Sequence, residues 1–444
     1  MVLNPIHIIG LGVSEQPELS SAALSALNRA GWVIGSSRQL KIVESLLQDQ
    51  QTLILPPLVE LPRHLDELEQ VEALAQAEKM AQDKTARPIV VLASGDPLYY
   101  GIGKWFKRHF PSERLRFYPA VSSIQAACHA LGLALQDVEV LSLHGRPLQG
   151  IRTALKANKT LVVLTDKHSQ PSILAQECIA AGFDESHLSV CESLGYSEQR
   201  IRHFTARELA VMDEAFDPLH VTVINCQGRG GFLPEFPGIQ DDRFITGEEP
   251  GKGMITKREV RLNILSLLQP GNDDVIWDIG AGCGSVAIEL AYWNERCRVF
   301  AIEHHPERLQ HLEANRQRFG VVSNLKIQAG HAPEVLTDLP SPSKVFIGGS
   351  DGRLSELLAL CWDQLPVGGI LAASAVTENT RYQLIEFMEQ RNLIHDAHME
   401  TLQIAVSRGG SLAGQLLYRP ALPVTLFRFV KSADTKNRLG NDPE

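Results

Sequence analysis

VIWDIGAGCGS, residues 275–285, decides the fold of the second half of this chain. An apolar run ends near Asp278, glycines follow at the alternate positions Gly280, Gly282 and Gly284, and the helical pattern SVAIELA begins at once. Glycine permits a tight turn close to a ligand, and the N-terminus of a helix offers free N–H groups. The spacing is GxGxG, whereas dinucleotide folds use GxGxxG. The stretch therefore predicts a nucleotide-like cofactor site where a buried strand ends.

The next strand of this half points to a particular cofactor. RVFAIEH carries Glu303 at its end, about 20 residues beyond the glycines, where a carboxylate can accept hydrogen bonds from both ribose hydroxyls. Together these features fit a site for S-adenosylmethionine (SAM), and the alternative is a structural turn followed by a solvated acid. The turn at Gly330, His331 and Ala332 is where the adenine edge would lie, although His331 taken alone is more often a loop residue than a ligand. His304 and His305 are interpreted as solvated, so we expect no metal.

The length of the chain predicts two domains. With 444 residues, two α/β cores of roughly 200 residues each are expected. Short apolar runs alternate with helical stretches in both halves, which predicts two mostly parallel sheets, each closing with antiparallel strands. Between them the sequence is rich in Gly, Pro and acid. We expect a first domain over 1–230, a linker over 231–253, a second domain over 254–431 and a flexible tail over 432–444.

Composition and charge exclude several classes of protein. Hydrophobic residues at 44% and charged residues at 21% are typical of a soluble globular chain. We expect no membrane span, and the N-terminal MVLNPIHIIGLG lacks the basic region of a signal peptide. A cytoplasmic location is therefore the default expectation. Seven scattered cysteines without a CxxC pair indicate reduced thiols, most of them in the core. The net charge of −10 disfavours nucleic acid as a partner.

Three short motifs stand out in the first half. GLG, Gly10 to Gly12, is evenly balanced between a plain turn and a ligand loop. ASGDPLYYGIG, residues 93–103, is sharper, because Gly95 and Pro97 bracket Asp96 at a strand end, where open α/β sheets bind ligands. The alternative is an Asp-Pro turn without a ligand. VSS, residues 121–123, either caps its helix or binds a ligand, and capping is the better interpretation of a single serine.

Further motifs extend these into a family resemblance. GLG, ASGDPLYYG, PAVSSIQAACHALGL, LSLHGRP and CESLGYSEQRI resemble the tetrapyrrole methylases of the corrin pathway, in particular those that methylate a precorrin at carbon 5. GMITKREVR, DIGAGCGSVAIELA, HAPEVL, KVFIGGS and GGILAASAVTENT resemble the class I SAM methyltransferases that methylate carbon 15 and remove an acetate carboxyl. The resemblance implies a tetrapyrrole-methylase-like α/β domain followed by a Rossmann-like class I SAM methyltransferase domain.

The resemblance also implies roles for individual residues. The first SAM site is implied at Gly10, Gly12, Gly95, Asp96, Ser122, Ser123, His144 and Gly145. The second is implied at Asp278, Gly280, Gly282, Gly284, Glu303, His331 and Ala332, with the catalytic candidates Met254, Thr256 and Lys257 beside cofactor and substrate. Two positions depart from the family pattern, because Val13 stands where proline is usual and His331 where an acid is commoner. Both departures concern loop geometry.

The activity implied by the resemblance belongs to cobalamin biosynthesis. It is methylation of a reduced precorrin-6 at C-5 and C-15, with decarboxylation of the ring C acetate to give precorrin-8. An oligomer is also implied. The anionic macrocycle must meet cations, for which the candidates beside the motif loops are Arg146, Arg229, Lys252, Lys257, Arg258, Arg261 and Arg408; for each, a solvated surface charge is the alternative.

Three other functions stay open at this point. One domain alone could be active, with the other serving as a scaffold. The chain could be an NAD-linked oxidoreductase, which the GxGxG spacing disfavours. It could also be a non-catalytic tetrapyrrole carrier, which would have no use for two cofactor loops.

Overall fold

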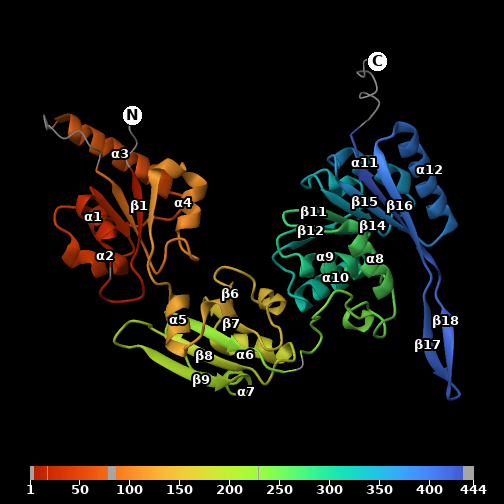
Figure 1. Ribbon diagram of the computed structural model, residues 1–444, viewed down its shortest axis with the longest axis horizontal. Helices are drawn as coiled ribbons and strands as arrows, with labels where there is room; N and C mark the ends of the chain where they lie inside the picture. Colours follow the sequence, from red (N-terminus) through yellow and green to blue (C-terminus); the bar gives the residue numbers. More distant parts are fainter. Residues whose placement is uncertain (1–4, 18, 79–86, 229, 434–444) are drawn as a thin grey trace, which may run out of the picture. The chain divides into compact units, whose positions relative to one another are not determined.

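The chain forms two compact units (Figure 1). The computed structural model describes residues 5–17, 19–78, 87–228 and 230–433. The first unit comprises Met1–Gly145 and Ala157–Gly228, and the second comprises Arg146–Lys156 and Arg229–Glu444. The expected linker over 231–253 thus falls inside the second unit, while residues 434–444 of the expected tail lie outside the described part. The boundaries of the two catalytic domains stay a prediction.

The first unit begins with a five-stranded parallel sheet. Its strand order is β3 (Gln51–Ile54), β2 (Trp32–Gly35), β4 (Ile89–Ala93), β1 (Ile6–Gly10) and β5 (Leu115–Tyr118). The helices between the strands are α1 (Ser21–Arg29), α2 (Ser37–Val43), α3 (Leu61–Glu78) and α4 (Gly103–His109). Successive side chains of β1 enter separate cores, Ile8 with Leu61 and Ile9 with Leu27, because the pleat directs them to opposite faces. Helices therefore cover both faces.

A second, mixed sheet completes the first unit. Its order is β6 (Val138–Ser142), β7 (Thr160–Leu164), β10 (His220–Asn225), β8 (His187–Glu192) and β9 (Arg200–Thr205). Only β6 and β7 are parallel, and the other pairs are antiparallel. Its helices are α5 (Ser123–Leu131), α6 (Pro171–Ala180) and α7 (Ala206–Ala210). The antiparallel close predicted for this half is confirmed.

The second unit is built on a seven-stranded sheet. Its order is β13 (Leu325–Ala329), β12 (Arg298–Glu303), β11 (Val275–Ile279), β14 (Lys344–Ile347), β15 (Ile370–Ala375), β19 (Val424–Lys431) and β16 (Ala397–Ile404). The first five are parallel, and β19 runs antiparallel to both neighbours, as predicted. The chain moves outward from β11 through β12 to β13, then returns to β14 on the other side. Ligands bind at such a switch point, beyond the carboxyl ends of the strands.

Among the described residues, five helices and an outlying hairpin complete this unit. The helices are α8 (Arg258–Leu268), α9 (Ser285–Trp293), α10 (Pro306–Arg318), α11 (Leu354–Gln364) and α12 (Glu378–Ile394). This unit also has the short 3₁₀ turns η4 (Leu148–Thr153), η5 (Asp241–Arg243) and η6 (Glu334–Leu336), and the first unit has η1 (Glu44–Leu46), η2 (Ser112–Arg114) and η3 (Leu135–Asp137). Strands β17 (Ser407–Leu412) and β18 (Gln415–Pro420) form a hairpin that projects from the sheet (Figure 1). None of the described helices is long and apolar enough to span a bilayer.

Candidate functional site

The turn between β11 and α9 has the geometry that its glycines predict. Gly280, Gly282 and Gly284 have φ values of 72°, 60° and 85°, a region that L-residues rarely adopt. A Cβ on Gly280 would lie 2.6 Å from the backbone nitrogen of Gly349, which follows β14. A Cβ on Gly284 would lie 2.1 Å from Leu312 of α10. The first and third glycines thus serve packing, and the second leaves space beside a cavity.

The carboxylate of Glu303 closes this turn from the neighbouring strand. Its Oε2 accepts a hydrogen bond from the backbone N–H of Gly282 at 2.9 Å. Its Oε1 accepts from the N–H groups of His304 and His305, each at 2.9 Å. Glu303 is 3% exposed and lines the cavity. Because each carboxylate oxygen has two lone pairs, Oε2 retains capacity for a ligand hydroxyl.

Asp278 has a structural task beneath the turn. It is 1% exposed, and its Oδ2 accepts from the backbone N–H of Ala287 at 2.9 Å, in the first turn of α9. Burial raises the pKa of its carboxyl to about 7, and the nearby charge of Glu303 acts in the same direction. Asp278 does not line the cavity. It acts by holding the start of the helix that follows the glycine turn.

A cavity of about 520 Å³ opens in the second unit at the carboxyl ends of β11, β12 and β14, and it is called the second cavity below. This volume lies within the range of about 300 to 1,000 Å³ that is usual for small-molecule sites. Of the residues predicted for the second site, those lining it are Met254, Thr256, Lys257, Gly280, Gly282, Glu303 and Ala332. Asp278, Gly284 and His331 do not line it. The structure thus brings together loops from residues 253–257, 280–282 and 330–332.

Two histidines and an acid stand at the edge of this second cavity. The rings of His304 and His331 stack with centroids 4.1 Å apart. Nδ1 of His304 lies 3.1 Å from Oδ2 of Asp351, and one ligand atom from each of the three residues lies within 4.8 Å of the others. Such a group has the donor types of a metal site. The expectation that the chain uses no metal stays a prediction.

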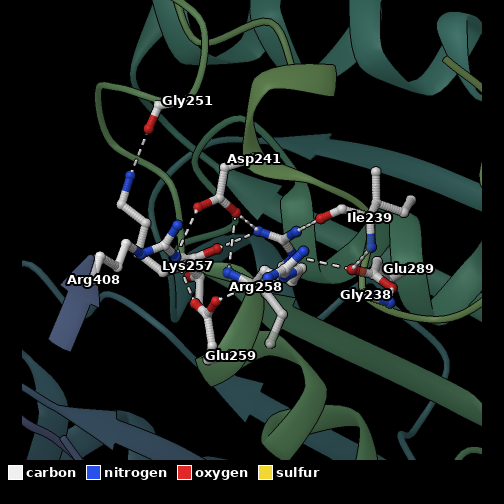
Figure 2. Close-up of polar contacts among 11 residues, drawn as sticks. Gly238, Ile239, Asp241, Gly251, Lys257, Arg258, Glu259, Glu289 and Arg408 are labelled. Carbon is white, nitrogen blue, oxygen red and sulfur yellow. Dashed lines mark hydrogen bonds and ion pairs between the residues drawn. The ribbon is translucent and has the colours of Figure 1, made fainter. Parts of the chain in front are cut away.

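A buried arginine, Arg261, joins a network of polar contacts beside the second cavity. Its partners Asp241, Glu289 and Ile239 are labelled in Figure 2. Arg261 of α8 is 0% exposed. Its guanidinium pairs with Asp241 at 2.8 Å and with Glu289 of α9 at 3.1 Å. It also donates to the carbonyl oxygens of Ile239 and Thr256. One side chain therefore connects two helices to the segment 239–256.

The partners of Arg261 extend this network along the same segment. Both oxygens of Glu289 accept backbone N–H groups, from Gly238 at 2.8 Å and from Ile239 at 3.0 Å. Lys257 donates from Nζ to the carbonyl oxygen of Gly251 at 2.8 Å. The network ends at the hairpin, where Arg408 pairs with Glu259 at 2.5 Å (Figure 2). Arg261 holds the backbone of Thr256, and the side chain of Lys257 is tied to Gly251; both residues line the cavity.

The turn around Asp96 is ordered by its own side chain. Oδ1 of Asp96 accepts the N–H groups of Leu98 and Tyr99, at 2.8 and 2.9 Å, and Oδ2 accepts from Ala120 at 3.3 Å. Ser122 caps α5, since its Oγ accepts from the N–H of Gln125 at 3.2 Å. Capping, the interpretation preferred for this serine, is confirmed. Both residues nevertheless line a cavity.

This first cavity has a volume of about 230 Å³. Its walls come from both sheets of the first unit, and five of the residues predicted for the first site line it: Gly12, Gly95, Asp96, Ser122 and Ser123. Gly10 lies behind it, where a Cβ would be 2.6 Å from the carbonyl oxygen of Gly95. His144 and Gly145 are not among the lining residues. Instead, Gly145 donates to Asp166 at 2.8 Å, a contact that helps to lower the pKa of that carboxyl to about 2.

Sequence reasoning missed several residues of both cavities. His220 lines the first, and burial lowers its pKa. Its Nδ1 lies 2.6 Å from the carbonyl oxygen of Asp217 and must donate, so Nε2 accepts from the hydroxyl of Thr165 at 2.7 Å. Arg38 lines the first cavity and Arg308 the second. Both belong to the first turns of helices that follow strands, a position that could have identified them.

Comparisons with known proteins match both halves of the chain. Residues 5–210 match the family described as Tetrapyrrole (Corrin/Porphyrin) Methylases. Residues 250–431 match the family described as Precorrin methyltransferase domain. The fold and these matches define the class as methyltransferases of corrin-type tetrapyrroles.

Relatives of full length narrow this class. A Sinorhizobium protein named precorrin-6Y C(5,15)-methyltransferase (decarboxylating) is 34% identical over 435 residues, 97% of each chain. A Mycobacterium tuberculosis protein of the same name is 30% identical over 96% of this chain and 100% of its own. A Methanothermobacter protein named probable cobalt-precorrin-6B C(15)-methyltransferase (decarboxylating) is 35% identical over 45% of this chain and 100% of its own. The chain belongs to the precorrin-6Y C(5,15)-methyltransferase (decarboxylating) family, and the predicted family is confirmed.

The raised pKa of Asp278 predicts a pH-dependent stability. The folded state keeps this carboxyl protonated up to about pH 7, whereas the unfolded chain releases the proton near its ordinary value of 3.8. Because the folded state binds more protons between these values, stability falls as pH rises through this window. Asp278→Asn removes the burial of a charge and keeps an acceptor for Ala287. We expect it to raise the free energy of unfolding by a few kcal/mol at pH 8 and by less at pH 5.

Calorimetry at the two pH values measures this difference. The control is Asp338→Asn, which neutralises an exposed carboxyl of the same unit. An equal shift at both pH values, or none, would show that Asp278 is ionised in the folded protein.

Proposed function

We propose that this chain methylates a reduced precorrin-6 at C-5 and C-15 and decarboxylates its ring C acetate, giving precorrin-8 in cobalamin biosynthesis. The similarity over 97% of both chains to a relative named for these reactions carries the proposal. Two separate cavities support it, one in each compact unit. The first serves C-5, and the second serves C-15 and the decarboxylation.

SAM is the cofactor of both proposed reactions. In the second unit, Gly282 leaves the turn open, since a Cβ there would have Met254 O, at 3.7 Å, as its nearest neighbour. Glu303 is positioned for the ribose hydroxyls, and the residues at 330–332 for adenine. In the first unit, Gly12, Gly95 and the turn of Asp96 take the corresponding role. When bound, SAM supplies a methyl group that its sulfonium already activates.

The protein's contribution to methyl transfer is to position the reactants. A methyl group moves to a ring carbon when the two are close and in line, so no nucleophilic side chain is required. Met254, Thr256 and Lys257 form the cavity wall beside cofactor and substrate. The network of Arg261 holds this wall. For the decarboxylation, the macrocycle takes up the electron pair that remains when carbon dioxide leaves, and an acid or water protonates the ring.

The proposal includes a homo-oligomer in the cytoplasm, without a nucleic-acid or membrane partner. The β17–β18 hairpin supports the oligomer, because Leu416 and Tyr418 share one side of it and are 68% and 67% exposed. A two-stranded hairpin is marginally stable by itself. All seven cysteines are free and buried, which suits a reducing compartment.

Mass analysis tests the proposed reactions. After incubation with reduced precorrin-6 and SAM, the product is expected to have gained two methyl groups and lost one carbon dioxide. Omission of SAM is the control. Gain of a single methyl group would mean that only one unit is active, and an unchanged mass with competent substrate would refute the proposal.

Equilibrium binding tests the two cofactor sites. We expect two SAM equivalents per chain, and one after either Gly12→Arg or Gly282→Arg, because each arginine would enter one cavity. Gly132→Arg and Gly368→Arg are matched controls, since both glycines have positive φ and a Cβ at either would meet no other atom within 4 Å. Both controls should keep two equivalents. Tight binding of NADH in place of SAM would favour an oxidoreductase.

Light scattering tests the oligomer. The double substitution Leu416→Asp and Tyr418→Asp should reduce the molar mass to that of one chain while leaving the unfolding temperature of the main sheet unchanged. Gln415→Asp, on the same hairpin, is the control. A wild-type protein that already has the mass of one chain would contradict this part of the proposal.

A further inference from the structure

Most cations that the sequence offered for the anionic substrate are occupied by other groups. Arg258, Arg261 and Arg408 pair with acids of the network, and Lys252 pairs with Glu249 at 2.5 Å. Arg146 lines neither cavity, and Arg229 lies outside the described residues. Of the seven candidates, only Lys257 lines a described cavity. Apart from Lys257, the cations that face the ligands must therefore be sought among other residues.

Arg308 faces the second cavity from a rigid helix. It lies in the first turn of α10, is half-buried and lines the cavity. The helix is held by Asn315, which is 0% exposed and exchanges hydrogen bonds with the N–H and C=O of Ile245, both at 2.8 Å. Within the described part of the chain, Arg308 forms no ion pair. The two acids that line the same cavity are occupied, Glu303 by backbone N–H groups and Asp351 by His304.

Arg38 lines the first cavity, and like Arg308 it belongs to the first turn of a helix. It lies at the start of α2, and it is the one lysine or arginine among the described residues that line this cavity. Its Nη2 donates to Oγ of Ser94 at 3.2 Å, and Gln39 donates to the same oxygen at 3.0 Å. The side chain is thereby held at the rim of the cavity. No described carboxylate pairs with Arg38, and Asp96 is occupied by backbone N–H groups.

We infer that Arg38 and Arg308 each bind a carboxylate of the ligand in their cavity. This inference rests on the proposed function, and it names the residues that recognise an anionic ligand at each site. A guanidinium fits a carboxylate with two parallel hydrogen bonds, and it keeps its charge at every physiological pH. Because the chain has a net charge of −10, an anion needs such a local cation in order to bind.

The carboxylate has two sources in the proposed reactions. One is a peripheral acetate or propionate of the macrocycle, and the other is the α-carboxylate of SAM. Decarboxylated SAM, which lacks that group, distinguishes them. If an arginine binds the cofactor, replacing it will weaken SAM binding but leave binding of decarboxylated SAM unchanged. If it binds the macrocycle, both cofactors will bind as they do to the wild-type protein.

Reciprocal substitutions test the inference in the full-length protein. Arg308→Gln should raise either KM for C-15 methylation or Kd for SAM at the second site by about tenfold or more, while C-5 methylation stays within about twofold. Arg38→Gln should have the reverse effect. The lysine variants should recover part of the loss, because they retain charge without the planar fork. Each glutamine variant controls for the other, and Arg298→Gln controls for loss of a charge outside both cavities.

Each SAM site can be measured alone. In a Gly12→Arg background only the second site remains for titration, and in a Gly282→Arg background only the first remains. Melting curves will show that each variant is folded. The inference is overturned for either arginine whose glutamine variant keeps KM and Kd within about twofold of wild type while the wild-type product shows both methylations. Absence of methylation by the wild-type protein would instead refute the proposed function.

Discussion

The buried guanidinium of Arg261 is the contact on which the second site depends. Removing a charge from water costs several kcal/mol, which is offset only when partners surround it. Asp241 and Glu289 supply opposite charges, and Ile239 and Thr256 supply carbonyl oxygens. The carboxylates in turn bind backbone N–H groups of the segment 238–258. A stretch with little regular structure thereby obtains a defined path, and residues 253–257 become a wall of the cavity.

Close backbone contact is the second constraint, and it acts in both units. Gly280 lies against Gly349, and Gly10 lies against Gly95, so that a Cβ at either position would be 2.6 Å from backbone atoms. In each pair, the turns that follow two adjacent parallel strands approach one another. The cavities open beside these contacts, at the carboxyl edges of the sheets. The two units differ in fold, but in both a close glycine contact lies beside a cavity at the ends of parallel strands.

Much of the fold and part of each site could be predicted from local patterns. The apolar strands, the glycine turn and the position of Glu303 depend on residues near one another in sequence, and they occur as expected. Contacts between residues far apart in the sequence could not be predicted from local patterns. The acid- and glycine-rich stretch 231–253 suggested a linker, yet it lies in the second unit, with Ile239 and Phe244 buried. Its path is held by Arg261, whose carboxylate partners Asp241 and Glu289 are 20 and 28 residues away in the sequence.

The sequence by itself determined the two α/β halves and the strand-end turns, because periodicity and glycine spacing act over a few residues. It also indicated the family, through motifs that resemble those of known members. Only the tertiary structure decided which charges are available to a ligand. Arg258, Arg261 and Arg408 looked equivalent to Lys257 in sequence, but folding pairs them with Asp241, Glu259 and Glu289. Arg38 and Arg308 belong to the first turns of helices that follow strands, a position that makes them candidates, but only the fold shows that they line the cavities. The reason is physical: ion pairing is set by distances between side chains, and those distances exist only in the folded chain.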